Sequence, residues 1–145
     1  MKWIQPITLE AFLNIPQKEA GFFDSFVYGP ANAEELERGY LFILGEIKTA
    51  SPNFTYFLNF LASIIRREYY SAAGKNVEQN LSRALERINE NPERLFANQL
   101  PSLFGNIHIL VGALVRNTLV LGFTGDMRAM ILKQNEICDL TALAS

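Results

Sequence analysis

The sequence predicts an α+β fold in which an antiparallel β-sheet packs against two antiparallel helices, with a β-meander at the C-terminal end. Strand-like runs occupy both ends of the chain, and a pair of amphipathic segments lies between them. The runs of the last third are joined by two or three residues, a length that only antiparallel neighbours allow. Strands and helices do not alternate, so a parallel sheet of βαβ units is not expected.

The composition is that of one globular domain. The 145 residues are 49% hydrophobic and 19% charged, which excludes a disordered or low-complexity chain. Thirteen basic and fifteen acidic side chains give a net charge of −2, so nothing indicates a nucleic-acid partner. The single cysteine excludes an internal disulfide. No apolar leader follows Met1–Pro6, and we therefore expect a cytoplasmic location.

The first third predicts two strands. Phe22–Tyr28 is aromatic and β-branched and ends at a Gly-Pro turn. Tyr40–Leu44 is a continuous apolar run, which is typical of a buried strand. Ala31–Gly39, between them, is polar and acidic and reads as a loop. Ile4–Phe12 has a mixed pattern and predicts a short strand or an irregular lead-in.

The middle of the chain opens with a helix start. The hydroxyl of Ser51 suits an N-cap, and Pro52 suits the first helical position. From Phe54 to Ile65, apolar residues recur every three to four positions, which predicts an amphipathic helix reaching about Tyr70.

A second helix is expected after a short connection. Asn76 with Gln79 three residues later resembles a capping box, and the apolar stripe runs from Val77 to Ile88. Pro92 ends this helix or begins a further turn. A short connection favours an antiparallel helix pair.

The last third predicts the meander. Its runs are Ile107–Val115, Thr118–Phe123, Met127–Leu132 and Glu136–Leu140. The first two form the most apolar window of the chain, but Arg116 stands at its centre. A charged residue at that depth is costly in a bilayer, so the window predicts two buried strands and no membrane-inserted segment.

Three segments carry a common family pattern. Gly125–Ala129 (GDMRA) is followed by a strand, a polar turn, a strand and Asp139–Thr141 (DLT). Gly39–Glu46 forms an apolar strand that ends in a carboxylate, and Phe23–Phe26 contains an early aspartate. In this order, over residues 20–141, the segments resemble the metal-dependent PP2C-like (PPM) protein phosphatases, whose patterns include Gly-Asp-Ser-Arg-Ala and Leu-Thr. The intervening helix pair also fits.

The resemblance implies a single PP2C-like domain over residues 1–145, with the N-terminal piece of a longer, membrane-anchored or soluble protein as the open alternative. Active members of the family use two Mg²⁺ or Mn²⁺ ions to activate a water. At the matching positions, Asp24, Glu46 and Asp126 are the candidate ligands of a residual metal site. Gly125, Asp126 and Arg128 form the retained structural motif.

The departures from the family pattern concern the metal ligands. Phe23 stands where the family has a glutamate, Ile47 replaces a glycine, and Ala142–Ser145 replaces an Asp-His step. The later Asp-Gly and Gly-Asp-Asn motifs do not occur. We therefore expect a catalytically inactive pseudophosphatase domain that serves as a protein-interaction or regulatory module, without catalytic residues or a cofactor. The alternatives are a divergent Mg²⁺- or Mn²⁺-dependent phosphatase and a subunit of a larger assembly.

The candidate site residues, and the single histidine and cysteine, can also be explained by purely structural roles. Asp126 suits a turn between strands, and Arg128 suits an ion pair with a carboxylate. The only histidine, His108, is expected to be a hydrogen-bonded structural residue, and Cys138 an inert buried thiol. The charged positions of the two helices mix arginine with glutamate, which is typical of a solvated face.

A sheet that ends earlier than the family's leaves an unpaired edge strand, which can pair with another chain. The expected partners are therefore a protein or a second copy of the chain, bound through an open sheet edge.

Overall fold

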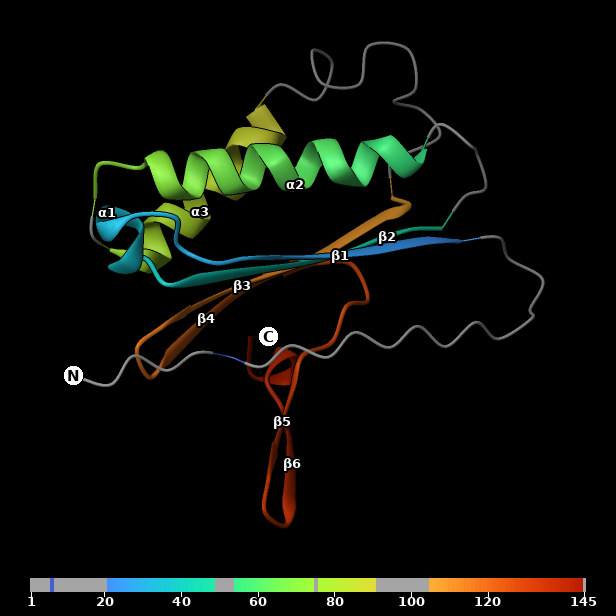
Figure 1. Ribbon diagram of the computed structural model, residues 1–145. Helices are drawn as coiled ribbons and strands as arrows, with labels where there is room; N and C mark the ends of the chain where they lie inside the picture. Colours follow the sequence, from blue (N-terminus) through green and yellow to red (C-terminus); the bar gives the residue numbers. More distant parts are fainter. Residues whose placement is uncertain (1–5, 7–20, 49–53, 75, 91–104, 145) are drawn as a thin grey trace.

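The computed structural model describes residues 6, 21–48, 54–74, 76–90 and 105–144. Within these ranges the fold is α+β and consists of a four-stranded antiparallel sheet, two packed helices and a separate two-stranded hairpin (Figure 1). The elements in chain order are β1 (Phe22–Tyr28), α1 (Ala33–Leu36), β2 (Tyr40–Ile47), α2 (Phe54–Ser71), α3 (Val77–Glu90), β3 (Ile107–Val115), β4 (Thr118–Thr124), β5 (Met130–Lys133), β6 (Glu136–Asp139) and η1 (Thr141–Ala144).

The main sheet has the strand order β1-β2-β3-β4, and every neighbouring pair is antiparallel. β2 and β3 are therefore central, although two helices separate them in the sequence. In β2 the side chains alternate strictly between buried and half-buried positions, as expected when one face of a sheet is covered more completely than the other.

The helices α2 and α3 lie on one face of the sheet (Figure 1). Leu41, Ile43 and Ile47 of β2 point to this face and are almost completely buried. The core between the layers is completed by Leu58, Leu61, Ala62, Ile65, Leu81, Ala84, Ile109, Val111 and Ala113. The apolar stripes read from the sequence thus form the core, and the predicted helices and strands are confirmed at these positions.

The C-terminal end of α2 is tied to the loop before β2 by two tyrosines. The Tyr69 hydroxyl donates to the backbone oxygen of Arg38 at 2.7 Å, and the Tyr70 hydroxyl donates to that of Gly39 at 2.8 Å. The rings meet edge to face, with centroids 5.1 Å apart. Burial raises the pKa of both phenols, that of Tyr69 to about 12.

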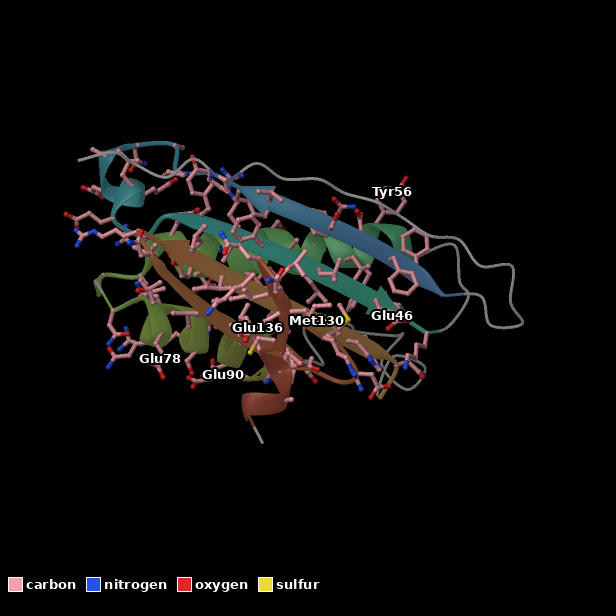
Figure 2. All side chains as sticks on the ribbon, turned by 90° about the horizontal axis from the view of Figure 1, so that it is seen from below. Glu46, Tyr56, Glu78, Glu90, Met130 and Glu136 are labelled. Carbon is pink, nitrogen blue, oxygen red and sulfur yellow. The ribbon has the colours of Figure 1, made fainter. Side chains whose placement is uncertain are left out.

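The other face of the main sheet, here called the open face, is covered by no helix within the described ranges. Figure 2 views the molecule from this side. The strand registers assign to it Phe23, Ser25, Val27, Tyr40, Phe42, Leu44, Glu46, His108, Leu110, Gly112, Leu114, Leu119, Leu121 and Phe123. Apart from Glu46 and His108 at one end, the face is uncharged and mostly apolar.

Two expectations about the chain's course are wrong. Residues 31–39 contain the short helix α1, because Asn32 caps it by accepting a hydrogen bond from the Glu35 backbone N–H. The four C-terminal strands do not form one meander, because β3 and β4 belong to the main sheet and β5 pairs only with β6 among the described strands. Gly125, with a φ of +73°, redirects the chain after β4.

Two further predictions concern residues near these changes. Cys138 is exposed rather than buried, because the β5–β6 hairpin stands apart from the core.

The predicted cap of the second helix is confirmed in part, since the Gln79 backbone N–H donates to the Asn76 side chain. The predictions for Ile4–Phe12, Ser51, Pro52 and Pro92 lie outside the described residues. No helix within the described ranges is long and apolar enough to span a bilayer.

Candidate functional site

A polar cluster occupies one end of the open face, where β2, β3 and the turn after β4 meet. Glu46 and His108 are directly opposite each other in the register of β2 and β3, so their side chains lie on the same face. The turn after β4 adds Asp126, and Lys48 follows the end of β2. The register, rather than any sequence motif, brings these four residues together.

His108 is the centre of the cluster and is 6% exposed. Its Nδ1 accepts a hydrogen bond from the Asp126 backbone N–H at 2.9 Å. This hydrogen bond assigns Nδ1 as the acceptor nitrogen of the ring and Nε2 as the nitrogen that carries a proton. The bond gives Nδ1 of the buried imidazole a partner and fixes the turn, as expected for a structural histidine.

Two carboxylates flank the imidazole at longer range. Glu46 Oε2 lies 3.8 Å and Asp126 Oδ2 lies 4.0 Å from His108 Nδ1. Neither contact has the length of a hydrogen bond. The Glu46 side chain is 18% exposed and the Asp126 side chain is 81% exposed. Glu46 therefore lies on the sheet surface, and Asp126 lies in solvent at the outer side of the cluster.

Lys48 neutralises the outer carboxylate. Its Nζ donates to Asp126 Oδ2 at 2.8 Å. The hydrogen bond and the charge of Lys48, followed by the influence of His108, hold the pKa of Asp126 below its usual value. Asp126 is thus an ionised, exposed carboxylate that already has a cationic partner.

The third predicted metal ligand lies elsewhere. Asp24 is opposite Gly45 in the register of β1 and β2, and a Cβ on Gly45 would touch Leu58 of α2. Asp24 therefore lies on the helix-covered face, whereas Glu46 lies on the open face. The Asp24 carboxylate accepts a hydrogen bond from the Ser25 backbone N–H at 2.9 Å. The structure brings Glu46 and Asp126 together around His108 and keeps Asp24 apart.

These donors do not fit the divalent metal that the family resemblance implies. Mg²⁺ and Mn²⁺ require several oxygen ligands converging on one point. Here the sheet separates one carboxylate from the other two, and the ammonium of Lys48 occupies the approach to Asp126. Within the described residues, no group of three or more His, Cys, Asp or Glu side chains is placed to hold a metal ion.

The remaining motif residues have structural contacts. Arg128 lies 3.9 Å from the Asp139 carboxylate, close enough for the expected ion pair. The Asp139 carboxylate accepts hydrogen bonds from the Thr141 backbone N–H and hydroxyl, and these bonds hold its pKa below the usual value. The Gly-Asp-x-Arg and Asp-Leu-Thr elements therefore shape the turn before β5 and the end of β6.

Comparison with known proteins adds no relative, because no family model, curated protein or solved structure matches this chain.

A second candidate site is the apolar part of the open face. Phe23 is 52% exposed and Leu119 40% exposed, while Val27 and Phe123 are each 37% exposed. Half-buried leucines and a phenylalanine of β2 and β3 lie between these side chains in the sheet. Exposed apolar side chains gathered on one face of a sheet are a feature of binding surfaces. The sequence alone does not predict this patch, because the alternation of side chains along a strand indicates two faces without showing which face the helices cover.

Proposed function

We propose that this chain is a catalytically inactive PP2C-like domain that acts as a protein-interaction module. The observation that carries the proposal is the apolar open face of the main sheet. A soluble domain that exposes aromatic and aliphatic side chains across four strands gains free energy by burying them against a partner. This extends the predicted binding mode from the sheet edge to the whole face.

The placement of the acidic residues supports an inactive domain. Asp24 and Glu46 are separated by the sheet, and Asp126 is paired with Lys48. Among the residues that resemble the family motif, Asp126 donates its backbone N–H to His108, and Asp139 and Thr141 are hydrogen-bonded to each other at the end of the β5–β6 hairpin. They therefore account for the likeness in sequence without any catalytic role.

The alternative is a divergent Mg²⁺- or Mn²⁺-dependent phosphatase. It is favoured by one observation, the approach of the Glu46 and Asp126 carboxylates to within 4.0 Å of His108. An acidic pair beside an imidazole is a common setting for acid–base chemistry.

Hydrolysis of an aryl phosphate, with and without excess Mn²⁺ or Mg²⁺, separates the two functions. The comparison is with a Glu46→Ala, Asp126→Ala double variant and with Asp24→Ala. We expect the same background rate from all the chains. Metal-dependent turnover that the double variant loses would overturn the inactive-domain proposal and identify the polar cluster as an active site.

The open face is tested separately with the apolar dye anilinonaphthalene sulfonate. The dye is added to a Leu132→Lys chain, in which the neighbouring hairpin has been made more polar, so that the signal reports on the sheet. Adding Phe123→Lys is expected to reduce the fluorescence at least about twofold, because a charge in the patch disfavours dye binding. Adding Tyr56→Lys, on α2, is the control. Equal signals from the Phe123 and Tyr56 variants would contradict an exposed apolar face.

A further inference from the structure

The β5–β6 hairpin presents a second apolar surface. The register pairs Leu132 with Ile137, and Met130 lies two residues before Leu132, so these three side chains share one face of the hairpin. They are 79%, 70% and 57% exposed, respectively. An isolated two-stranded hairpin is only marginally stable in water and normally packs against another surface.

The hairpin and the open face lie on the same side of the molecule. Figure 1 shows the hairpin on the side of the sheet opposite the helices, projecting away from it. The high exposure of Leu132 and Ile137 shows that the hairpin does not bury its apolar face on its own sheet. Each chain therefore carries an apolar sheet face and a projecting apolar hairpin, both without a described partner.

We propose that a second copy of this chain covers the open face, with the β5–β6 hairpin of each copy lying on the sheet of the other. Reciprocal exchange about a two-fold axis satisfies both surfaces at once and leaves no copy unmatched. The inference rests on the proposed function as an interaction module and specifies its partner.

The available area is sufficient for a stable dimer. Among the described residues, ten large hydrophobic side chains are exposed, and seven of them lie on these two surfaces: Phe23, Val27, Leu119, Phe123, Met130, Leu132 and Ile137. If each of these side chains is given roughly 180 Å² when fully exposed, near the lower end of the range for aromatic side chains, their exposed fractions amount to at most roughly 650 Å² per copy. Complete burial of these side chains in both copies would remove at most about 1,300 Å² of apolar surface from water, which reaches the lower part of the range of specific interfaces.

The distribution of charge agrees with this arrangement. On the sheet, the ionisable groups Glu46 and His108 lie together at one end, which leaves the centre uncharged. On the hairpin, Lys133 and Glu136 flank the turn on the opposite face, whereas Asp139 pairs with Met130 on the apolar face, at the base of the hairpin, where its carboxylate lies 3.9 Å from Arg128. The Leu132–Ile137 pair can therefore meet the apolar middle of the sheet while Asp139 stays at the margin of the contact, beside Arg128.

Sedimentation or light scattering of the wild-type chain should give a mass of about 33 kDa, twice 16.4 kDa. Leu132→Lys on the hairpin and Phe123→Lys on the open face should each weaken dimerisation at least about tenfold, because each places an ammonium in the apolar interface. Tyr56→Lys, at an 80% exposed position on α2, is the matched control and should remain dimeric. Circular dichroism confirms that each variant is folded.

The native single cysteine locates the interface. A chain that carries a spin label on Cys138 is mixed with a ¹⁵N-labelled chain that carries Cys138→Ser. Only contacts between the two copies can then broaden the amide signals. Docking on the face should broaden Phe42, Leu44 and Leu110 in the central strands. Broadening confined to β1 or β4 would instead show pairing of sheet edges and would overturn the proposed geometry.

A monomeric wild-type chain at all accessible concentrations would overturn the second-copy inference. The interaction-module function would still be supported if dye binding depended on Phe123, because the open face would then be available to a different protein. Failure of the function itself is detected by the hydrolysis measurement, which does not depend on the oligomeric state, and by the dye measurement, made on the Leu132→Lys chain at a concentration where sedimentation shows it to be monomeric.

Discussion

Gly125 lies directly against the ring of His108: a Cβ on Gly125 would be 2.5 Å from the His108 Cγ. Gly125 also has a φ of +73°, a conformation that other residues adopt at a cost. The next residue donates its backbone N–H to the same imidazole. The glycine of the Gly-Asp element is therefore required by the packing of the turn on a buried histidine.

Gly125→Ala should destabilise the fold by about 2–4 kcal/mol, because it adds a steric clash to the left-handed backbone strain. Gly105→Ala is the matched control. Gly105 has a nearly identical φ of +75°, but a Cβ there would meet nothing within 4 Å. Its cost should be only about 1 kcal/mol. Urea denaturation measures both, and equal losses would show that His108 does not crowd the turn.

Alkaline pH should weaken the fold through Tyr69. Burial raises its folded-state pKa to about 12, whereas an exposed tyrosine has a pKa near 10. Between these values the unfolded chain releases a proton that the folded chain keeps, so the free energy of unfolding falls as the pH rises. The stabilisation is complete below pH 10 and is lost toward pH 12.

Tyr69→Phe removes this ionisation together with the hydrogen bond to Arg38. At pH 8 the variant should be less stable by about 1 kcal/mol, and between pH 10 and 12 it should lose less stability than the wild type. Tyr56→Phe, at an exposed position, should follow the wild-type profile. Denaturation curves across this pH range provide the measurement, and parallel profiles for Tyr69→Phe and the wild type would contradict the expectation.

Lys48→Met should raise the pKa of Asp126 toward its usual value. The hydrogen bond from Lys48 and its positive charge are the main causes of the lowered pKa, whereas Arg128 contributes least. Arg128→Met is therefore the control and should produce a smaller shift. Stability linked to Asp126 is present above its unfolded pKa and is lost as the pH falls through the lowered value. Because Asp126 is exposed, the effect should appear in a carboxyl NMR titration rather than in the melting temperature.

The helices and strands that form the two layers of the fold could be predicted from the sequence, whereas several of the segments that connect them could not. The 3.6-residue periodicity of α2 and α3 and the apolar runs of β2 and β3 are dictated by the core, so they can be read locally. The helix α1 was missed although Asn32 and Glu35 have the spacing of a capping box. That signal was present in the sequence and outweighed by the polar composition.

The candidate site could not be predicted from local sequence patterns. Whether Asp24 and Glu46 share a face depends on the register of β1 against β2, and a shift by one residue would reverse the answer. The pairing of Glu46 with His108 joins strands about 60 residues apart, for which no local pattern exists. The separation of β5 and β6 from the sheet likewise follows from a turn fixed by His108, a tertiary contact.

The close packing of β2 against α2 gives a final prediction. A Cβ on Gly45 would lie 2.7 Å from Leu58 Cδ2 in the buried core, so Gly45→Ala should cost about 1–3 kcal/mol. Leu58→Ala should cost about 2–5 kcal/mol through the cavity it leaves. In the double variant the new methyl group partly fills that cavity, and the combined loss should be smaller than the sum by about 0.5–3 kcal/mol.

Gly112→Ala is the matched control for this cycle. Gly112 is also in a central strand, but it faces the open side, where a Cβ would lie 3.1 Å from Leu121 Cδ2. Leu121 is only half-buried and has room to shift, so the cost should stay below about 1 kcal/mol. Chemical denaturation of the four variants measures the cycle. Strict additivity of Gly45→Ala and Leu58→Ala would show that the two residues do not share one packing space, and would count against the described contact between β2 and α2.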